Sequence, residues 1–522
     1  MKHLFTLMTF FIAFIFFSFK TEENDPIVNR IIELGKNDNH ADEWMSILCK
    51  RFGGRITGSV AYESAAQWAA SRFREWGMEV ILDEAGEVPV GFERGPFSGK
   101  MLSEEGMVLH FATPSYTSGT RGPQRGHVVL EPKTQQEFDR MKAKLRGAWV
   151  LITGKNDGYP IDYTEKGDHI RDSIIRLNEE IKAKNEKIKA ENEKIKDKSK
   201  QKELIPLADT PALFYRQMCQ AGILGIIQSA ALPIRVMYDR KNLPEMRFET
   251  LPEIPDIKLD EHQYFIIEQK VKERQDVILE FDIRNYFRPG PVRYYNVIGV
   301  IKGTDYPDEY VIMGGHLDSY DISRGASDNA TGAVQAMEAA RLIMNAGGKP
   351  KRTILVCLWA AEEFGLLGSW HWININEEKL PKISNMFNWD SGPRVFTGIS
   401  VSDSMMADMR KICSPISTIN PDYPFEVSRR EPQEKPEKAW GTDSGPFAVK
   451  GVPTMNFTAS DVKGYDFNYY EIWHTERDDY SRLIPEYIAH NAIVTAVVVY
   501  GVANLDHLLN RQGYYLEKQK KE

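Results

Sequence analysis

Two adjacent glutamates, Glu362 and Glu363, follow a continuous apolar run at residues 354–359. Such a run is typical of a strand that is buried on both faces. Glutamate is rarely buried unless it is paired or bound to a metal. Because adjacent residues in an extended segment point to different sides, the two carboxylates are expected to have different tasks. One could bind a metal while the other acts as general base on a metal-bound water, although a solvated pair at a strand end fits the spacing too.

A second candidate cluster lies in "GGHLDSYDISRGASDNATG", residues 314–332. His316 and Asp318 follow an apolar strand and are two residues apart, so both face one side. An imidazole can bind metal through one nitrogen while a carboxylate holds the other. Asp328 precedes a predicted helix, and there capping and metal binding are equally compatible with its position. In open α/β sheets, ligands collect at the carboxyl ends of strands, where these residues are expected.

Two further residues complete a candidate metal set. Asp390 follows a short apolar segment in "MFNWDSG", and His474 lies in the aromatic-rich "EIWHTERDD", where a lone histidine is more often a packing residue. Nitrogen and carboxylate ligands suit zinc. Five ligands exceed the needs of one catalytic zinc with an open position. They fit two ions that share a bridging carboxylate, roughly 3.5–4 Å apart. The candidate ligands are His316, Asp328, Glu363, Asp390 and His474, with Glu362 to spare.

These motifs resemble those of the dizinc exopeptidase family that contains bacterial leucyl aminopeptidases and plasma glutamate carboxypeptidase. The resembling segments, in the family's order, are "GGRITGS", "GGHLDS", "GASDNATGA", "WAAEEFGLLGS", "NWDSG" and "WHTERDD". The resemblance covers most of residues 25–510. It implies a zinc-dependent enzyme that hydrolyses the peptide bonds of short peptides or dipeptides, with two Zn²⁺ per chain. It also implies which residues hold the metals: His316 and Asp390 one zinc, Glu363 and His474 the other, and Asp328 both.

The resemblance assigns the supporting residues as well. Glu362 matches the general base that takes a proton from the bridging water and passes it to the leaving amine. Asp318 matches the catalytic-site carboxylate that orients the ring of His316. Asp478 falls where family members often have an aspartate that supports the metal-binding His474.

One motif departs from the family pattern. Where the family often has Ser-Asp-His, this chain has Thr442-Asp443-Ser444, and Trp440 stands where some members have a tyrosine that assists the oxyanion. The oxyanion-stabilising residue therefore stays unassigned. The sequence also leaves open which end of a peptide is trimmed and which side chains are preferred.

Two other functions are compatible with such a fold. Secreted glutaminyl cyclases, which are acyltransferases, work with one zinc, and the presence of both His316 and Asp390 argues against that function. The transferrin receptor ectodomain resembles this fold as a non-catalytic binding protein. Proteins of that kind erode the ligands, whereas here every ligand position and Glu362 are intact.

The 522 residues predict more than one domain. Alternating strand and helix patterns predict an α/β protein. We expect a three-layer α/β/α catalytic domain with a central mixed, mainly parallel sheet, formed by residues 23–95 and 285–515. Residues 96–284, with "LRGAWVLITG" and "AGILGIIQSA", resemble a β-rich protease-associated domain inserted in larger family members.

A charged helical insertion is expected within that domain, at about residues 165–204. Isoleucine recurs there every seven residues, at Ile174, Ile181, Ile188 and Ile195. A coiled coil needs apolar residues at two positions of each heptad, and only one is filled. A long solvated helix or hairpin is therefore favoured over an oligomerisation arm.

The N-terminus predicts export to the periplasm or beyond the cell. Lys2 and His3 precede an apolar stretch at residues 4–19, which is typical of a signal peptide at residues 1–22. No small-residue cleavage site is clear, so an uncleaved membrane anchor is the alternative. The net charge of −8 argues against a nucleic-acid partner. Larger family members are commonly dimers, which makes a homodimer an option. Four scattered cysteines predict buried free thiols, although one bridge could form after export.

Overall fold

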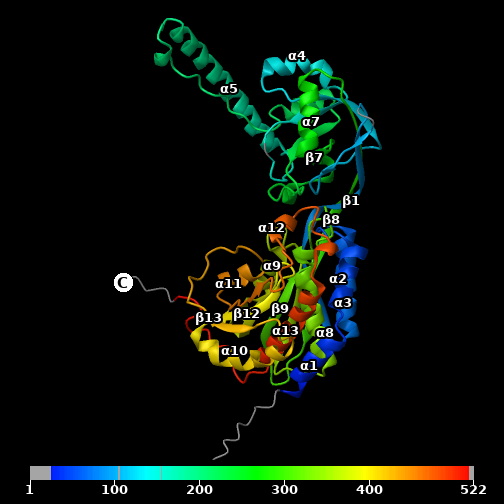
Figure 1. Cartoon of the computed structure of the whole chain (residues 1–522), viewed down its shortest axis with the longest axis vertical. Coiled ribbons are helices and arrows are strands. Elements are labelled where there is room, and N and C mark those ends of the chain that lie inside the picture. The colour runs from blue at the N-terminus through cyan, green and yellow to red at the C-terminus, as the bar shows by residue number, and fades with distance from the viewer. Residues whose placement is uncertain (1–24, 104–105, 155, 517–522) are drawn as a thin grey trace, which may run out of the picture.

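Two long antiparallel strands, β1 (Glu79–Met101) and β8 (Ile278–Ile301), run through both lobes of the molecule (Figure 1). The computed structural model describes residues 25–103, 106–154 and 156–516, so the predicted signal segment lies outside it. The pairing of β1 with β8 is irregular between Val88 and Val90. We divide the chain there into a lower lobe (residues 25–88 and 292–516) and an upper lobe (residues 90–289). Both predicted domain boundaries fall inside these strands. The apolar patterns in "DVILEFDIRNYF" and "YNVIGVIKG" belong to one continuous strand, β8.

The lower lobe is built on a mixed sheet, as the α/β fold class predicted. Its further strands are β9 (Tyr306–His316), β10 (Arg352–Trp359) and β11 (Ile383–Asn388). The order is β11-β9-β10-β8, with β1 on the other side of β8. Strand β9 pairs parallel with β10 and β11, whereas β8 is antiparallel to β10. The carboxyl ends of β9, β10 and β11 therefore share one edge of the sheet.

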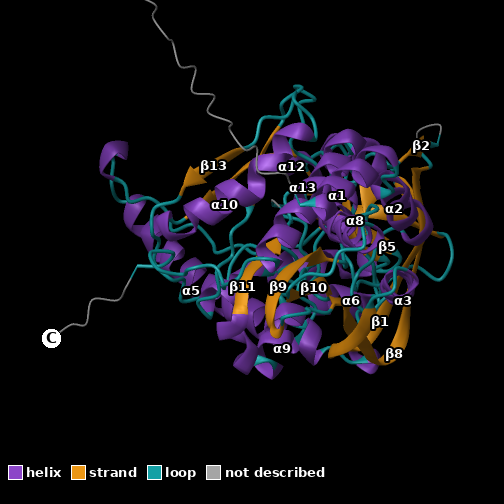
Figure 2. Ribbon diagram, turned by 90° about the horizontal axis from the view of Figure 1, so that it is seen from below, coloured by secondary structure: helices purple, strands orange, loops and turns teal. Residues whose placement is uncertain are grey.

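Helices cover both faces of this sheet (Figure 2). All eight residues of β10 are buried, as its apolar run predicted. Val356 packs in the apolar cluster that includes Val334 and Val494, whereas its neighbour Cys357 packs with Trp372 and Phe447 on the opposite face. The first cluster contains α1 (Pro26–Asn37), α2 (Ala41–Ile47), α3 (Val60–Glu75), α8 (Thr331–Asn345) and α13 (Pro485–Ala503), and the second contains α9 (Leu367–Ile375) and α11 (Ser444–Val449).

Helix α13 is apolar on all sides because it lies inside this core. Among the described residues it is the one helix long and apolar enough to cross a membrane, but 83% of its most apolar window is buried in the lobe. A small second sheet lies beside it. The remaining elements of the lower lobe are β12 (Val395–Val401), β13 (Glu426–Arg429), β14 (Phe457–Ser460), α10 (Met406–Cys413) and α12 (Tyr469–Ile472).

The upper lobe continues the sheet from β8 in the order β8-β4-β5-β6-β7-β3. Strands β4 to β7 are parallel, and β3 closes the edge antiparallel to β7. Its elements are β2 (Met107–Val108), β3 (Phe111–Ala112), β4 (Gln124–Leu130), β5 (Ala148–Ile152), β6 (Gly225–Ala230), β7 (Asp256–Asp260), α4 (Gln135–Leu145), α5 (Glu165–Asn192), α6 (Tyr215–Ala221) and α7 (Glu261–Lys272).

Helix α5 forms an arm that projects from the upper lobe (Figure 1). Residues 202–208 run back along it and are held by three asparagines. Each asparagine side chain donates to a backbone carbonyl of this segment and accepts the N–H of the same residue, all at 2.8 Å. The pairs are Asn178 with Ala208, Asn185 with Ile205, and Asn192 with Lys202. The asparagines recur every seven residues, a helical rise of about 10.5 Å, and their partners recur about every three extended residues, which span roughly 10 Å. The spacing of the asparagines therefore matches that of their partners.

The asparagines occupy the heptad position that the isoleucines leave free. Asn178, Ile181 and Asn185 follow one another at the four- and three-residue steps of a helical seam. That seam is covered by the chain's own returning segment.

The four cysteines are all free; Cys49, Cys357 and Cys413 are buried, but Cys219 is only half-buried.

Candidate metal centre

The carboxyl edge of β9, β10 and β11 carries most of the predicted site residues. His316 is the last residue of β9, and Asp390 comes two residues after β11. Glu362 and Glu363 lie beyond the end of β10 in a tight turn, and not in an extended segment as expected. Ala361 before them has a φ of 54°. The N–H groups of Gly365 and Leu366 both donate to the Glu362 carbonyl at 2.8 Å. This turn brings both side chains back over the strand ends.

Asp328 lies between the two predicted metal-binding histidines. Its Oδ1 is 3.2 Å from Nε2 of His316, and its Oδ2 is 3.2 Å from Nε2 of His474. The residue precedes α8, but its φ of −119° and ψ of 91° are not helical. One carboxylate thus faces two imidazoles with separate oxygens. That is the geometry of a bridging ligand rather than of a helix cap.

Each histidine has a second carboxylate partner. Nε2 of His316 is 3.4 Å from Oδ1 of Asp390, and Nε2 of His474 is 3.0 Å from Oε2 of Glu363. Ligand atoms bound to zinc at about 2.0–2.1 Å in tetrahedral geometry lie roughly 3.3–3.4 Å apart. The four nitrogen–oxygen distances at the histidines are close to that spacing. Glu362 is different, because its Oε2 is 4.0 Å from Nε2 of His316.

Asp318 is buried and supports the Glu362–Glu363 turn directly. Its Oδ1 accepts the N–H of Glu362 at 3.2 Å, and its Oδ2 accepts that of Glu363 at 3.3 Å. Thr57 of the "GGRITGS" turn donates to Oδ2 at 3.1 Å. Nδ1 of His316 lies 3.0 Å from the backbone carbonyl of Asp318 and 3.6 Å from its carboxylate. The His316 ring is therefore oriented mainly by the backbone of Asp318.

Asp478 holds the segment that carries Asp328. It accepts the N–H of Ser327 at 2.6 Å and that of Asp328 at 3.1 Å. The ring of His474, which Asp478 was expected to support, instead places its Nδ1 3.3 Å from Sδ of Met237. Asp478 thus acts on the bridging carboxylate through the backbone.

Burial and charge shift the titration of the site strongly. Burial raises the pKa of Glu363 to about 7 and holds that of Glu362 well above its usual range. Burial would lower the pKa of His474, but Glu363 and Asp328 raise it to about 9. Burial would likewise raise the pKa of Asp328, but the two histidines hold it below its usual range. A dense cluster of carboxylates without a nearby cation is costly, and a bound cation would offset that cost.

Several polar atoms of this cluster are buried without a hydrogen-bond partner. They include Nε2 of His316, Oε1 of Glu363 and Oδ1 of Asp390. Ligand atoms of His316, Glu362 and Asp390 lie within 4.8 Å of one another, as do those of His316, Asp328 and Glu363. Buried polar groups are normally paired, so unpaired ones that converge require a ligand. Nitrogen and carboxylate donors in this arrangement fit a transition-metal site.

The sequence analysis missed two residues beside the cluster. Asp443 is fully buried, accepts the hydroxyl of Ser369 at 2.5 Å, and has its pKa raised to about 8 by burial. It lies in the departing motif "GTDSGPF", which was noted only for what it lacks. Arg55 is fully buried and donates to the carbonyls of Leu317 at 2.8 Å and Gly325 at 2.9 Å. It lies in "GGRITGS", one of the segments that carry the family resemblance.

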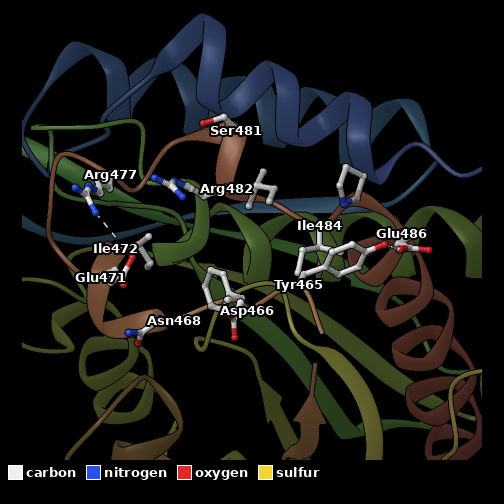
Figure 3. Close-up of a pocket in the computed structure, with 13 residues that line it drawn as sticks. Tyr465, Asp466, Asn468, Glu471, Ile472, Arg477, Ser481, Arg482, Ile484 and Glu486 are labelled. Carbon is white, nitrogen blue, oxygen red and sulfur yellow. Dashed lines mark hydrogen bonds and ion pairs between the residues drawn. The ribbon is translucent and has the colours of Figure 1, made fainter. Parts of the chain in front are cut away.

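A cavity of about 370 Å³ lies beside the segment that carries His474 (Figure 3). Arg477 and Arg482 line one side of it, and Glu471 is 3.9 Å from Arg477. None of the candidate metal ligands lines this cavity, and its charges are mixed. It is therefore separate from the metal centre.

Comparison with known proteins relates the lower lobe to a peptidase family. The model of "Peptidase family M28" matches residues 296–499, which include every candidate metal ligand. This region of the chain is therefore similar to peptidase family M28. Carboxypeptidase Q of Mus musculus is 23% identical over 495 residues, which are 93% of this chain and 91% of that protein. The chain is a metallopeptidase, and the family resemblance seen in the motifs is confirmed.

Solved structures show the same fold. A peptidase M28 precursor from Shewanella amazonensis SB2B has a TM-score of 0.57 and 21% identity, covering 93% of this chain and 97% of that one. A zinc aminopeptidase from Bacillus subtilis has a TM-score of 0.52 and 17% identity, covering 92% and 98%. Both matches extend over the two lobes. The fold of both lobes is therefore shared with these two structures.

Proposed function

We propose that this metallopeptidase is a dizinc exopeptidase that hydrolyses the peptide bonds of short peptides or dipeptides. The observation that carries the proposal is the position of Asp328, whose two oxygens each lie 3.2 Å from a different histidine. A single metal would not require one carboxylate to serve two imidazoles. The zinc aminopeptidase neighbour supports zinc as the metal.

The chain's own residues divide into metal holders and a proton carrier. His316 and Asp390 would hold one zinc, His474 and Glu363 the other, and Asp328 both. When bound, the metals would polarise the scissile carbonyl and lower the pKa of a water molecule. Glu362 would take the proton of that water and pass it to the leaving amine. Its 4.0 Å distance from His316 keeps it outside the ligand spacing, and burial raises its pKa, which favours its taking up a proton.

The other parts of the chain fit an exported enzyme. We propose that the upper lobe is a protease-associated domain and that α5 with its returning segment is an insertion in it. The apolar N-terminal stretch at residues 4–19 would direct the chain to the periplasm or outside the cell.

The deciding experiment incubates the zinc-loaded protein with a mixed library of short peptides and follows the products by mass spectrometry. We expect shortening from one end, which also identifies the enzyme as an aminopeptidase, a carboxypeptidase or a dipeptidase. Metal analysis should give two zinc ions per chain. One zinc with pyroglutamate formation would support a glutaminyl cyclase-like acyltransferase, and no bound metal with no turnover would support a receptor-like binding protein.

A further inference from the structure

One segment of the upper lobe, residues 234–240, reaches the metal centre. It follows β6 and is tied to its own lobe by Met237, whose N–H donates to Gly158 at 2.8 Å and whose carbonyl accepts from Ser115 at 3.1 Å. Ile234 and Val236 pack with Ala112 and Ala230 of the upper lobe, but the next two side chains point the other way. Met237 and Tyr238 are buried in the apolar cluster of the lower lobe. The segment therefore belongs to one lobe by its backbone and to the other by its packing.

The first contact of this segment is with the turn that carries Glu363. The hydroxyl of Tyr238 and Nη2 of Arg240 both donate to the backbone carbonyl of Glu363 at 2.8 Å. The Tyr238 ring also packs against Phe364, with ring centroids 4.3 Å apart. Two donors on one carbonyl, together with a ring on the next side chain, restrict how the turn can rotate. The direction of the Glu363 carboxylate depends on that rotation.

The second contact is with the loop that carries His474. The N–H of Val236 donates to the His474 carbonyl at 3.4 Å, and Arg235 and Thr475 form an antiparallel bridge. Sδ of Met237 lies 3.3 Å from Nδ1 of His474. His474 itself has a φ of 56°, in the left-handed region that non-glycine residues rarely adopt. A strained residue of this kind persists only where its surroundings hold it.

The contacts are selective. Glu363 and His474 are the two residues proposed to hold one of the metals, apart from the bridging Asp328. Within residues 25–103, 106–154 and 156–516, no hydrogen bond or ion pair runs from the upper lobe to His316 or Asp390. General packing between lobes would not favour one metal position over the other.

We infer that residues 234–240 position Glu363 and His474, so that the upper lobe controls one metal position of the centre and leaves the other to the lower lobe. Tyr238 and Arg240 are positioning residues, because they act through the Glu363 backbone. The inference rests on the proposed dizinc function. Residues that orient metal ligands typically contribute about 10–100-fold in metal affinity.

The test measures stepwise zinc binding by competition with a chromophoric chelator in wild type, Tyr238→Phe and Arg240→Met. We expect one of the two zinc affinities to fall about 10–100-fold while the other stays within a factor of about two. Arg240→Lys keeps a donor and should lose less than Arg240→Met. The control is Tyr264→Phe, which removes another buried tyrosine bond to a backbone carbonyl of the upper lobe, 2.9 Å from Ile152, away from the site. It should leave both affinities unchanged.

A second measurement uses cobalt in place of zinc. The visible spectrum of cobalt at the position proposed for Glu363 and His474 should change in Met237→Leu, because Met237 contacts the His474 ring. Unchanged zinc affinities in the Tyr238 and Arg240 variants, or equal weakening at both positions, would overturn the inference. A wild-type protein that binds fewer than two zinc ions would instead overturn the proposed function, so the two failures are distinguishable.

Discussion

Asp478 holds the backbone of Asp328, because its Oδ2 accepts the Asp328 N–H at 3.1 Å. Its other oxygen accepts the preceding N–H, of Ser327, at 2.6 Å. Asp328 faces both histidines of the centre. Asp478, which was expected to support one histidine, therefore holds the backbone of the carboxylate that lies between both histidines.

The first prediction concerns Asp478→Asn. The amide keeps one acceptor oxygen but replaces the other with a donor, so one backbone bond to the Asp328 segment is lost. Because Asp328 is shared, we expect both zinc affinities to fall, each about 10–100-fold, in a chelator competition. Asp479→Asn, one residue along and half-exposed at 41%, is the matched control and should have little effect. If only the zinc affinity of the position held by His474 fell, Asp478 would act on His474, as the sequence resemblance implied.

The second prediction separates the adjacent glutamates. Glu362→Gln should keep two zinc ions but reduce kcat at least about 10²-fold, since the side chain can no longer take a proton. Glu363→Gln should bind one zinc ion less, because it removes the carboxylate 3.0 Å from His474. Metal analysis and peptide turnover on both proteins check this. If Glu362→Gln lost a metal and Glu363→Gln kept both, the two assignments would have to be exchanged.

Strand ends were the part of the site that the sequence could predict. The apolar runs before His316 and Asp390, and before the Glu362–Glu363 pair, are buried strands, and parallel strands bring their carboxyl ends to one edge. Periodicity could not place Asp328 or His474. Asp328 is non-helical directly before α8 and His474 has a positive φ, so their positions depend on contacts between distant segments.

The fold, like the site, could be predicted from the sequence only in part. The α/β class follows from alternating patterns, but the continuity of β8 through both lobes does not, because a strand that leaves one core and enters another carries no single pattern. The isoleucines of α5 reveal its seven-residue repeat. The sequence does not reveal that the asparagines fill the second position of that repeat, because their partners are backbone groups and not side chains.

The third prediction concerns the pH dependence of the metal-free protein. Burial raises the pKa of Glu363 and Asp478 to about 7 and that of Asp443 to about 8, whereas unfolded carboxyls titrate near pH 4. Between about pH 4 and 8 the folded state therefore binds more protons than the unfolded state, so stability falls as pH rises. His474, raised to about 9, acts in the same direction between about pH 6.5 and 9.

Calorimetry of the chelator-treated protein should thus show a Tm that decreases from pH 5 to 9. The Tm of the zinc-loaded protein should decrease less over this range. The difference between the Tm of the zinc-loaded and the metal-free protein should therefore widen with pH, because protons compete less with the metal at higher pH. Asp443→Asn removes one of the titrating groups and should flatten the metal-free curve. A metal-free Tm that rises from pH 5 to 8 would contradict the assigned shifts.

The fourth prediction concerns the arm. Asn185→Ala removes two hydrogen bonds of 2.8 Å to Ile205. It does not weaken the helix itself, because alanine is a better helix former than asparagine. Each such bond contributes about 0.5–1.5 kcal/mol net, so the returning segment should open more often. Hydrogen exchange at Ile205 should accelerate roughly 5–100-fold, while the global Tm and peptide turnover stay unchanged because the arm projects away from both cores. Glu203→Ala, at an exposed position of the returning segment outside the asparagine pairs, is the control. Unchanged exchange at Ile205 would mean that the pairing does not hold the segment.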